Sequence, residues 1–141
     1  MDDIKHFMSN SSLSVDSKAT VLETIKLMRD KKVGSLLVTE NGDFVGIFTE
    51  TDLLRKVAAE EGSPEKTQVS SVMSSPLLSI DGNKSMVTAF LMMQQKNIRH
   101  LGVLDNNKIT GVISIRDITN YYVSKLERNK GFAPKLVEIR T

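Results

Sequence analysis

The sequence predicts an α/β fold made of two copies of one unit, strand–helix–strand–strand–helix, that pack against each other through their sheets. The first observation is a repeat. Residues 46–52 (GIFTETD) align with residues 111–117 (GVISIRD), and the same 65-residue register holds without a gap from 7–54 onto 72–119. The second observation is that apolar stretches and turn residues follow one order in both copies. The third is size, because a unit of about 60 residues buries too little apolar surface to fold comfortably alone.

The first copy begins with a strand and a helix, which are followed by a hairpin and a second helix. Thr20 and Glu23 have the spacing of a capping box, and apolar residues recur behind them at helical intervals. Asn41-Gly42 between two apolar runs predicts a tight hairpin turn. The elements are therefore expected at 13–15 (strand), from 20 up to Gly34 (helix), at 35–39 and 44–48 (strands), and from 49 onward (helix).

The second copy repeats this order after a polar segment at 60–66, which contains Gly and Pro and is expected to be a linker. A turn is expected at Asp105-Asn106-Asn107. The elements are expected at 77–80 (strand), from 85 (helix), at 101–104 and 109–113 (strands), and from 114 to about 127 (helix).

The composition argues against several classes of protein. The 141 residues include no cysteine and two histidines, so we expect neither disulfides nor a metal site, and the cysteine count suits a reducing cytoplasm. The apolar runs are too short to cross a bilayer, and the acidic start is not a signal peptide. A net charge of +2 gives no case for a nucleic-acid partner. Because His6 and His100 are far apart and neither accompanies a nucleophile motif, we do not expect an enzyme.

The repeated segments resemble a tandem pair of CBS domains (the cystathionine-β-synthase repeat), also called a Bateman module. The residues that carry the resemblance are 33–38 and 46–54 in the first copy, 98–103 and 111–118 in the second, and the leading pairs Phe7-Met8 and Val72-Met73. The resemblance covers residues 4–125, nearly the whole chain. It implies a first CBS domain at 4–59, a linker at 60–68, a second CBS domain at 69–125 and a C-terminal tail at 126–141.

The resemblance also implies ligands and an assembly. CBS pairs have pseudo-two-fold symmetry and two clefts, which are often occupied by adenosine-containing ligands: AMP, ADP or ATP, and less often S-adenosylmethionine or NAD. Two pairs frequently dimerise into a flat disc of four domains. No cofactor is required, since an adenine nucleotide would act as a regulatory ligand. Its signal would pass to an effector protein that the sequence does not identify.

Two motifs, Thr49-x-x-Asp52 and Ser114-x-x-Asp117, follow a strand and open a helix. On one interpretation they are capping boxes that satisfy backbone amides. On the other, the helix amides attract an anion, the hydroxyl bonds phosphate or ribose, and the aspartate accepts from ribose hydroxyls. With the resemblance, we expect at least one aspartate to contact a ribose, and both roles can coexist.

Three cationic side chains are candidate phosphate ligands. By the resemblance, Arg99 and His100 lie where a strand start faces the cleft, and some members place His-Arg there against phosphates. The alternative is a surface arginine and a half-buried histidine. Arg116 matches an arginine common in the family, and its alternative is a solvated residue in the first turn of a helix. Because the first copy has uncharged residues at these positions, we expect unequal clefts with Asp117 at the stronger one, unless Arg99 reaches a nucleotide held by Asp52.

Apolar residues and a glycine complete the candidate site. By the resemblance, Val33, Gly34 and Ile98 would border the adenine pockets. For Val33 and Ile98 the alternative is plain core.

Two functions are therefore possible. One is a regulatory or sensor module that binds an adenosine-containing ligand in the cleft between the repeats and signals to a partner. The alternative is a ligand-independent dimerisation or interaction scaffold, in which the two motifs are only caps. We expect a homodimer because the helix stripes at 21–28 and 86–93 carry more apolar surface than a monomer of this size easily hides. The tail is expected to dock on the module or on a dimer mate.

Overall fold

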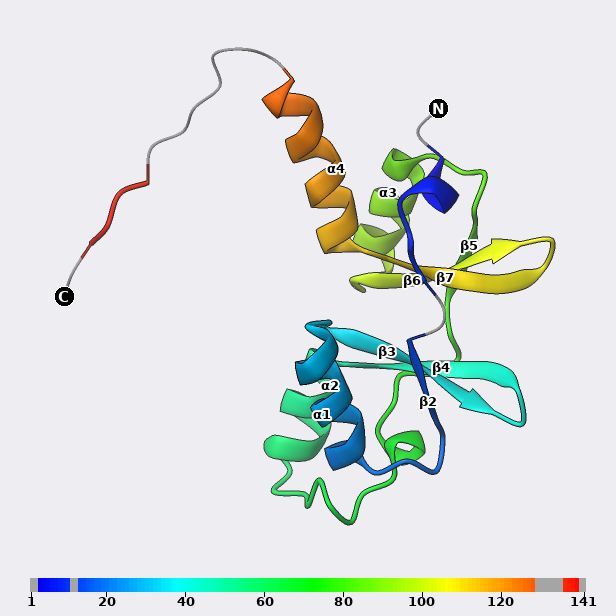
Figure 1. Ribbon diagram of the computed structural model, residues 1–141, viewed down its shortest axis with the longest axis vertical. Coiled ribbons are helices and arrows are strands. Elements are labelled where there is room, and N and C mark those ends of the chain that lie inside the picture. The colour runs from blue at the N-terminus through cyan, green and yellow to red at the C-terminus, as the bar shows by residue number, and fades with distance from the viewer. Residues whose placement is uncertain (1–2, 11–12, 129–135, 140–141) are drawn as a thin grey trace.

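Two sheets face each other in the middle of the molecule, and most of the helices lie on their outer sides (Figure 1). The computed structural model describes residues 3–10, 13–128 and 136–139. Repeat one consists of β2 (Ser14–Asp16), α1 (Val21–Lys31), β3 (Ser35–Glu40), β4 (Asp43–Thr49), α2 (Glu50–Asp52) and its continuation η2 (Leu53–Ala58). Repeat two consists of β5 (Ser79–Asp81), α3 (Met86–Lys96), β6 (His100–Asp105), β7 (Lys108–Ser114) and α4 (Ile115–Glu127). The predicted fold class is confirmed.

The two sheets share the same pairing. In repeat one, β2 is parallel to β3 and β3 is antiparallel to β4. In repeat two, β5, β6 and β7 are related in the same way. Both hairpins shift register directly after an equivalent valine, Val38 and Val103. The repeat seen in the sequence therefore extends to the irregularities of the backbone.

The helix ends place the residues that follow them. Capping boxes open three of the helices, at Thr20, Thr49 and Ser114. At the other end, α1 and α3 stop at Lys32 and Asn97, which both adopt the left-handed conformation with φ of 56° and 53°. This reversal turns the chain back at once, so the residues before β3 and β6 lie beside the first turns of α2 and α4.

The leading segments of the two repeats are exchanged. η1 (Ile4–His6) lies in repeat two, where the side chain of Ile4 is fully buried with Ile80 and Met86, and β1 (Ser9–Asn10) pairs with β7. Conversely, η3 (Val69–Ser71) buries Val69 in the core of repeat one. The division expected at 4–59 and 69–125 follows the order of the chain. The packing units differ from it because each leading segment completes the opposite core.

Gly46 shows why the repeated motif begins with glycine. The segment after η3 runs along β4, where Ile47 and Ser74 exchange backbone hydrogen bonds of 3.0 and 2.8 Å. A Cβ atom at Gly46 would lie 2.7 Å from the carbonyl oxygen of Ser74, closer than packed atoms approach. Glycine is therefore required at this position by the close approach of the exchanged segment.

A third cluster joins the repeats. Leu37 and Ile47 of repeat one pack against Val112 of repeat two, and all three are at most 9% exposed. Each sheet therefore covers the inner face of the other, as predicted from the small size of each unit.

The apolar helix stripes differ from the expectation. Val21 and Met28 of α1, like Met86 and Met93 of α3, are at most 5% exposed because they fill the cores of their own repeats. The argument for a dimer from α1 is therefore wrong. On α3, another face remains open, with Val87 and Leu91 more than half exposed.

The described part of the tail is exposed. Leu136, Val137 and Ile139 have at least 81% of their surface in solvent, so these side chains do not dock on the described module. Docking on a dimer mate stays a prediction, and tail residues 129–135 and 140–141 lie outside the described residues. Among the helices of the described ranges, none is long and apolar enough to cross a membrane.

The exchange predicts that Ile4, close to the start of the chain, is a core residue of repeat two. Ile4→Ala should lower the free energy of unfolding by about 2–5 kcal/mol, measured by urea denaturation, because it leaves a cavity. Val69→Ala, its counterpart in repeat one, should act in the same direction. Leu136→Ala, at a fully exposed position, is the control. Equal stability of Ile4→Ala and the control would contradict the exchange.

Candidate functional site

Two clefts related by the pseudo-symmetry open between the repeats. The one that contains Asp117, here the Asp117 cleft, has a volume of about 330 Å³. The one that contains Asp52, the Asp52 cleft, has a volume of about 370 Å³. Both volumes lie at the lower end of the range for small-molecule sites.

All ten predicted site residues line one of these clefts. The Asp117 cleft contains Val33, Gly34, Thr49, Arg99, His100, Ser114, Arg116 and Asp117. The Asp52 cleft contains Thr49, Asp52, Ile98, Arg99 and His100. Each cleft takes walls from both repeats, so a bound molecule would contact both. The ligand roles of these residues stay predictions.

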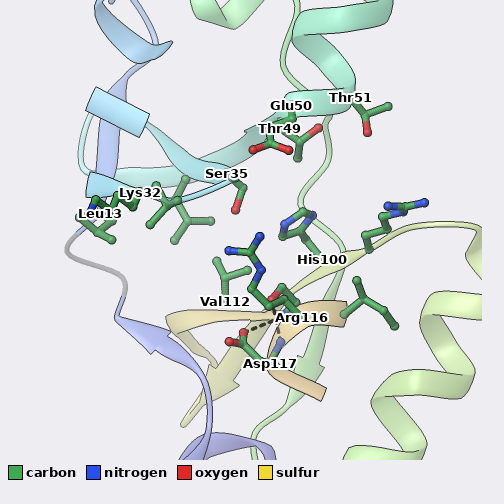
Figure 2. A pocket seen from close by; sticks show the side chains of 16 residues that line it. Leu13, Lys32, Ser35, Thr49, Glu50, Thr51, His100, Val112, Arg116 and Asp117 are labelled. Atoms are coloured by element: carbon green, nitrogen blue, oxygen red, sulfur yellow. Dashed lines mark hydrogen bonds between the residues drawn. The ribbon is translucent and has the colours of Figure 1, made fainter. Parts of the chain in front are cut away.

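Arg99 and His100 belong to both clefts. Arg99 directly precedes β6, the first strand of the hairpin in repeat two, and His100 begins that strand, and each residue lines both cavities. Figure 2 shows His100 between Thr49 and Glu50 of repeat one and Arg116 of repeat two. Arg99 and His100 therefore do not distinguish the clefts by their position, and the expectation that they serve one of them stays a prediction. The clefts differ in their other charged residues, because the Asp117 cleft also contains Lys32, Glu50 and Arg116, and the Asp52 cleft also contains Arg55.

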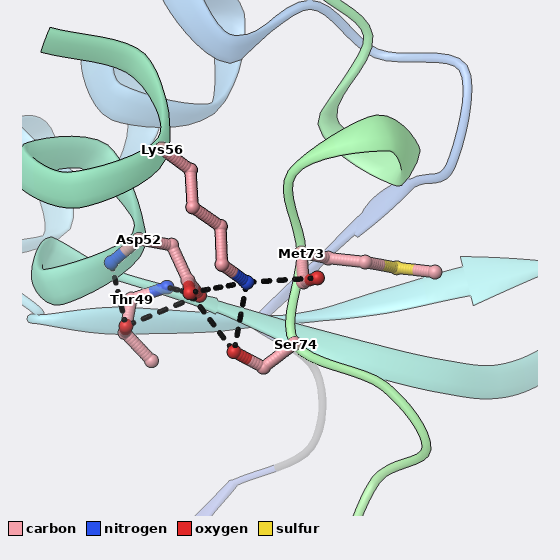
Figure 3. A network of polar contacts seen from close by, with 5 residues as sticks. All are labelled: Thr49, Asp52, Lys56, Met73 and Ser74. Carbon is pink, nitrogen blue, oxygen red and sulfur yellow. Dashed lines mark hydrogen bonds and ion pairs between the residues drawn. The ribbon is translucent and has the colours of Figure 1, made fainter. Parts of the chain in front are cut away.

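The carboxylate of Asp52 is fully occupied by the protein (Figure 3). Its Oδ1 accepts a 2.9 Å hydrogen bond from Ser74 Oγ and lies 3.0 Å from Lys56 Nζ. Its Oδ2 accepts from the amide and the hydroxyl of Thr49, over 3.0 and 3.2 Å. Only 4% of Asp52 is exposed. Because Ser74 belongs to the exchanged segment, this carboxylate ties that segment to the start of α2.

Asp117 has the same backbone position and a different environment. Its Oδ2 accepts a 2.8 Å hydrogen bond from the amide of Ser114, and its own amide donates to Ser114 Oγ over 3.1 Å. Within the described ranges, Oδ1 of Asp117 has no polar contact. The residue is half-buried. The capping interpretation therefore holds for both motifs, and one oxygen of Asp117 is left for a hydroxyl donor.

The charge state of His100 is set mainly by burial. Desolvation lowers the pKa of His100 below its ordinary value of 6.5. The carboxylates of Asp117, Asp52 and Glu50 oppose this lowering, while Arg99 adds to it. The imidazole is therefore neutral near pH 7, and an anion placed beside it would raise its pKa again.

Sequence reasoning missed several polar residues in the lining of the clefts, Lys32, Glu50, Arg55 and Ser74 among them, and it missed Lys56, which contacts Asp52 without lining either cleft. Lys56 and Ser74 hold Asp52, and the carboxylate of Glu50 lies against Gly34, 3.3 Å from where a Cβ atom would be. The spacing of Asp52 and Lys56, four residues apart on a helix, is a signal for an ion pair. Ser74 and Glu50 carry no such signal, because their positions depend on the packing of the repeats. Among the described residues, no group of three or more His, Cys, Asp or Glu could hold a metal ion.

Comparison with known proteins identifies the class. The model of the CBS domain matches residues 3–59 and 69–124, which together cover most of the chain. The chain therefore belongs to the CBS-domain family, as a tandem pair.

Three proteins illustrate the similarity. CBS domain-containing protein YhcV of Bacillus subtilis is 32% identical over 118 residues, which cover 84% of each chain. The structure of a protein with CBS domains from Burkholderia ambifaria has a TM-score of 0.77 at 33% identity, covering 87% of this chain and 88% of that one. The hexameric CBS-CP12 protein from bloom-forming cyanobacteria has a TM-score of 0.78 at 28% identity, covering 91% and 75%. Several other relatives are longer, and this chain spans 58% of one and 23% of another.

The burial of His100 predicts a pH dependence of stability. The unfolded chain takes up a proton on this imidazole near pH 6.5, whereas the folded chain does so only at lower pH. Since the unfolded state then binds more protons, the free energy of unfolding should fall as the pH drops below about 6.5. When the free energy of unfolding is measured by urea denaturation between pH 7.5 and 5.5, His100→Gln should remove this part of its dependence on pH. His6→Gln, at an exposed position, should leave the pH dependence unchanged. An unchanged slope in His100→Gln would contradict the assignment.

Proposed function

We propose that this protein is a regulatory module that binds an adenosine-containing ligand, AMP, ADP or ATP, between its two repeats and signals its presence to an effector protein. The observation that carries the proposal is the composition of the Asp117 cleft. One oxygen of the Asp117 carboxylate has no donor among the described residues of the protein. The same cleft contains His100 and the cationic side chains of Lys32, Arg99 and Arg116. A ribose offers hydroxyl donors to the Asp117 carboxylate, and phosphates offer anionic oxygens to the cationic side chains and to His100.

The remaining walls suit a nucleoside. Val33 and Gly34 lie beside the cleft at the end of α1, and both are half-buried. The start of α4, a helix of 13 residues, contributes a positive dipole end, although the amides of Ser114, Ile115 and Asp117 already have acceptors within the protein. An aromatic base against Val33 would then place the ribose near Asp117.

The charge and size of the cleft favour nucleotides over the other adenosine ligands. S-adenosylmethionine carries a sulfonium and an ammonium group beside one carboxylate, so it lacks the anionic phosphate that Lys32, Arg99 and Arg116 would bind. NAD is a dinucleotide, and about 330 Å³ is small for it. No reaction and no cofactor are part of the proposal, and we place the protein in the cytoplasm.

The signal would arise from the relative position of the repeats. A ligand in the cleft contacts both of them, so it stabilises those arrangements in which both walls are at the right distance. The outer helices would present this change to a partner. The alternative function is a scaffold that assembles without a ligand.

We further propose a homodimer formed through repeat two. Its exposed apolar side chains lie on α3 and α4 and include Val87, Phe90, Leu91, Tyr122, Val123 and Leu126. In repeat one, the position equivalent to Leu91 is Lys26, which is exposed. The hexameric assembly of the related CBS-CP12 protein supports self-association as a property of such modules.

Nucleotide binding predicts a rise in the melting temperature. At a hundredfold excess over Kd, a ligand that binds only the folded state adds about 2.7 kcal/mol, or several degrees for a domain of this size. AMP, ADP and ATP should be tested at millimolar concentration in a thermal-shift assay. The matched control is 2′,3′-dideoxyadenosine 5′-phosphate, which lacks the ribose donors and should act more weakly. A flat response to all three nucleotides would favour the scaffold.

The dimer predicts a strong effect of charge on α3. Leu91→Lys gives α3 the residue found at the equivalent position of α1. Because a charge would be buried in the interface without a partner, this variant should be a monomer. Light scattering at micromolar concentration should then give the mass of one chain for the variant and of two chains for the wild type. Lys26→Glu is the control and should leave the mass unchanged. A wild-type mass of one chain would refute the dimer.

A further inference from the structure

We infer that each chain binds one nucleotide, with its ribose on Asp117, and that Lys56 and Ser74 close the Asp52 cleft to ribose. The inference rests on the proposed function and assigns its stoichiometry. The family fold offers two equivalent aspartates, so the difference must come from residues particular to this chain. Three independent observations support it.

The first observation is that Asp52 has no acceptor left. Both of its oxygens are engaged, Oδ1 by Lys56 and Ser74 and Oδ2 by Thr49. A ribose hydroxyl could bind Oδ1 only by displacing the ammonium group or the Ser74 hydroxyl. The displaced ammonium belongs to a side chain that is 43% exposed, and it would keep water, the carbonyl oxygen of Met73 and the hydroxyl of Ser74 as acceptors, the last two at 3.3 and 3.5 Å. Exchanging a charge-assisted contact for neutral ones is unfavourable.

The second observation is that Asp117 lacks this cation. The position equivalent to Lys56 is Tyr121, so α4 brings no ammonium group to Asp117 from that place. Among the residues that the structure describes, Oδ1 of Asp117 has no polar contact, and the carboxylate is half-buried rather than enclosed. A hydroxyl donor can therefore bind Asp117 without breaking a protein contact.

The third observation is that the clefts share Arg99 and His100. Arg99 and His100 line both cavities, and one copy of each must serve any phosphate that enters. After one nucleotide has bound, a second phosphate would meet an Arg99 side chain that already has an anionic partner, and the first phosphate would repel it. Each cleft also has charged residues of its own, Lys32, Glu50 and Arg116 in the Asp117 cleft and Arg55 in the Asp52 cleft, so the choice between the clefts rests on the two aspartates.

Calorimetric titration tests the inference. The wild-type protein should bind about one AMP per chain. Asp117→Asn, which keeps the side-chain shape, should weaken binding at least about tenfold, since a charge-assisted bond to the ribose is lost. Asp52→Asn is the matched variant at the equivalent position and should leave the affinity within about threefold.

Replacing Lys56 tests whether its ammonium group keeps a ribose from Asp52. In Lys56→Met, Oδ1 of Asp52 loses its ammonium partner, so a second ribose site should open. The probe is adenosine, which has no phosphate to compete for Arg99 and His100. Lys56→Met should bind two adenosine molecules per chain where the wild type binds one. Lys26→Met, at an exposed lysine on α1 outside both clefts, should behave as the wild type.

The outcomes separate this inference from the proposed function. Two AMP molecules per wild-type chain, or a loss of binding in Asp52→Asn instead of Asp117→Asn, would overturn the single site while leaving nucleotide binding intact. One adenosine in Lys56→Met would overturn the role of Lys56. No heat with any adenine nucleotide would overturn both the inference and the proposed function.

Discussion

The contact between the two sheets is the constraint on which the rest of the structure depends. Each repeat exposes an apolar sheet face, and Leu37, Ile47 and Val112 cover one another where these faces meet. The strand ends on either side of this contact cannot close completely, because the helices that follow them turn outward. The two clefts are therefore a consequence of packing two small units by their sheets. A molecule in either cleft lies on the boundary that holds the protein together, which couples occupancy to the arrangement of the repeats.

The exchanged segments make this boundary harder to separate. Ile4 lies in the core of repeat two and Val69 in the core of repeat one, so the repeats cannot part without exposing both cores. Relative motion should then consist of small shifts within a joined structure. Asp52 contributes to the joint, since its carboxylate holds Ser74 of the exchanged segment.

One motif thus serves two purposes in a nearly symmetric frame. In both repeats the aspartate closes a capping box, which uses one carboxylate oxygen and needs no ligand. The second oxygen is used for structure at Asp52 and is left without a protein donor at Asp117 among the described residues. At Asp52 this oxygen is held by Lys56 and by Ser74, whereas the position equivalent to Lys56 in repeat two is Tyr121.

The sequence by itself determined the repeat, the order of the elements, the hairpins and the helix starts, because these follow from local periodicity, capping and turn chemistry. It also identified ten residues that line the clefts. Thr49, Asp52, Ser114 and Asp117 came from the repeated motif, and the other six came from the resemblance to the family. The tertiary structure alone decided which residues meet across the repeats. The exchange of Ile4 and Val69, the sharing of Arg99 and His100 and the contact of Ser74 with Asp52 all join residues that are distant in the chain. The exposed face of α3 was likewise decided by packing, because a helix with apolar residues on several faces does not reveal which of them the core will cover.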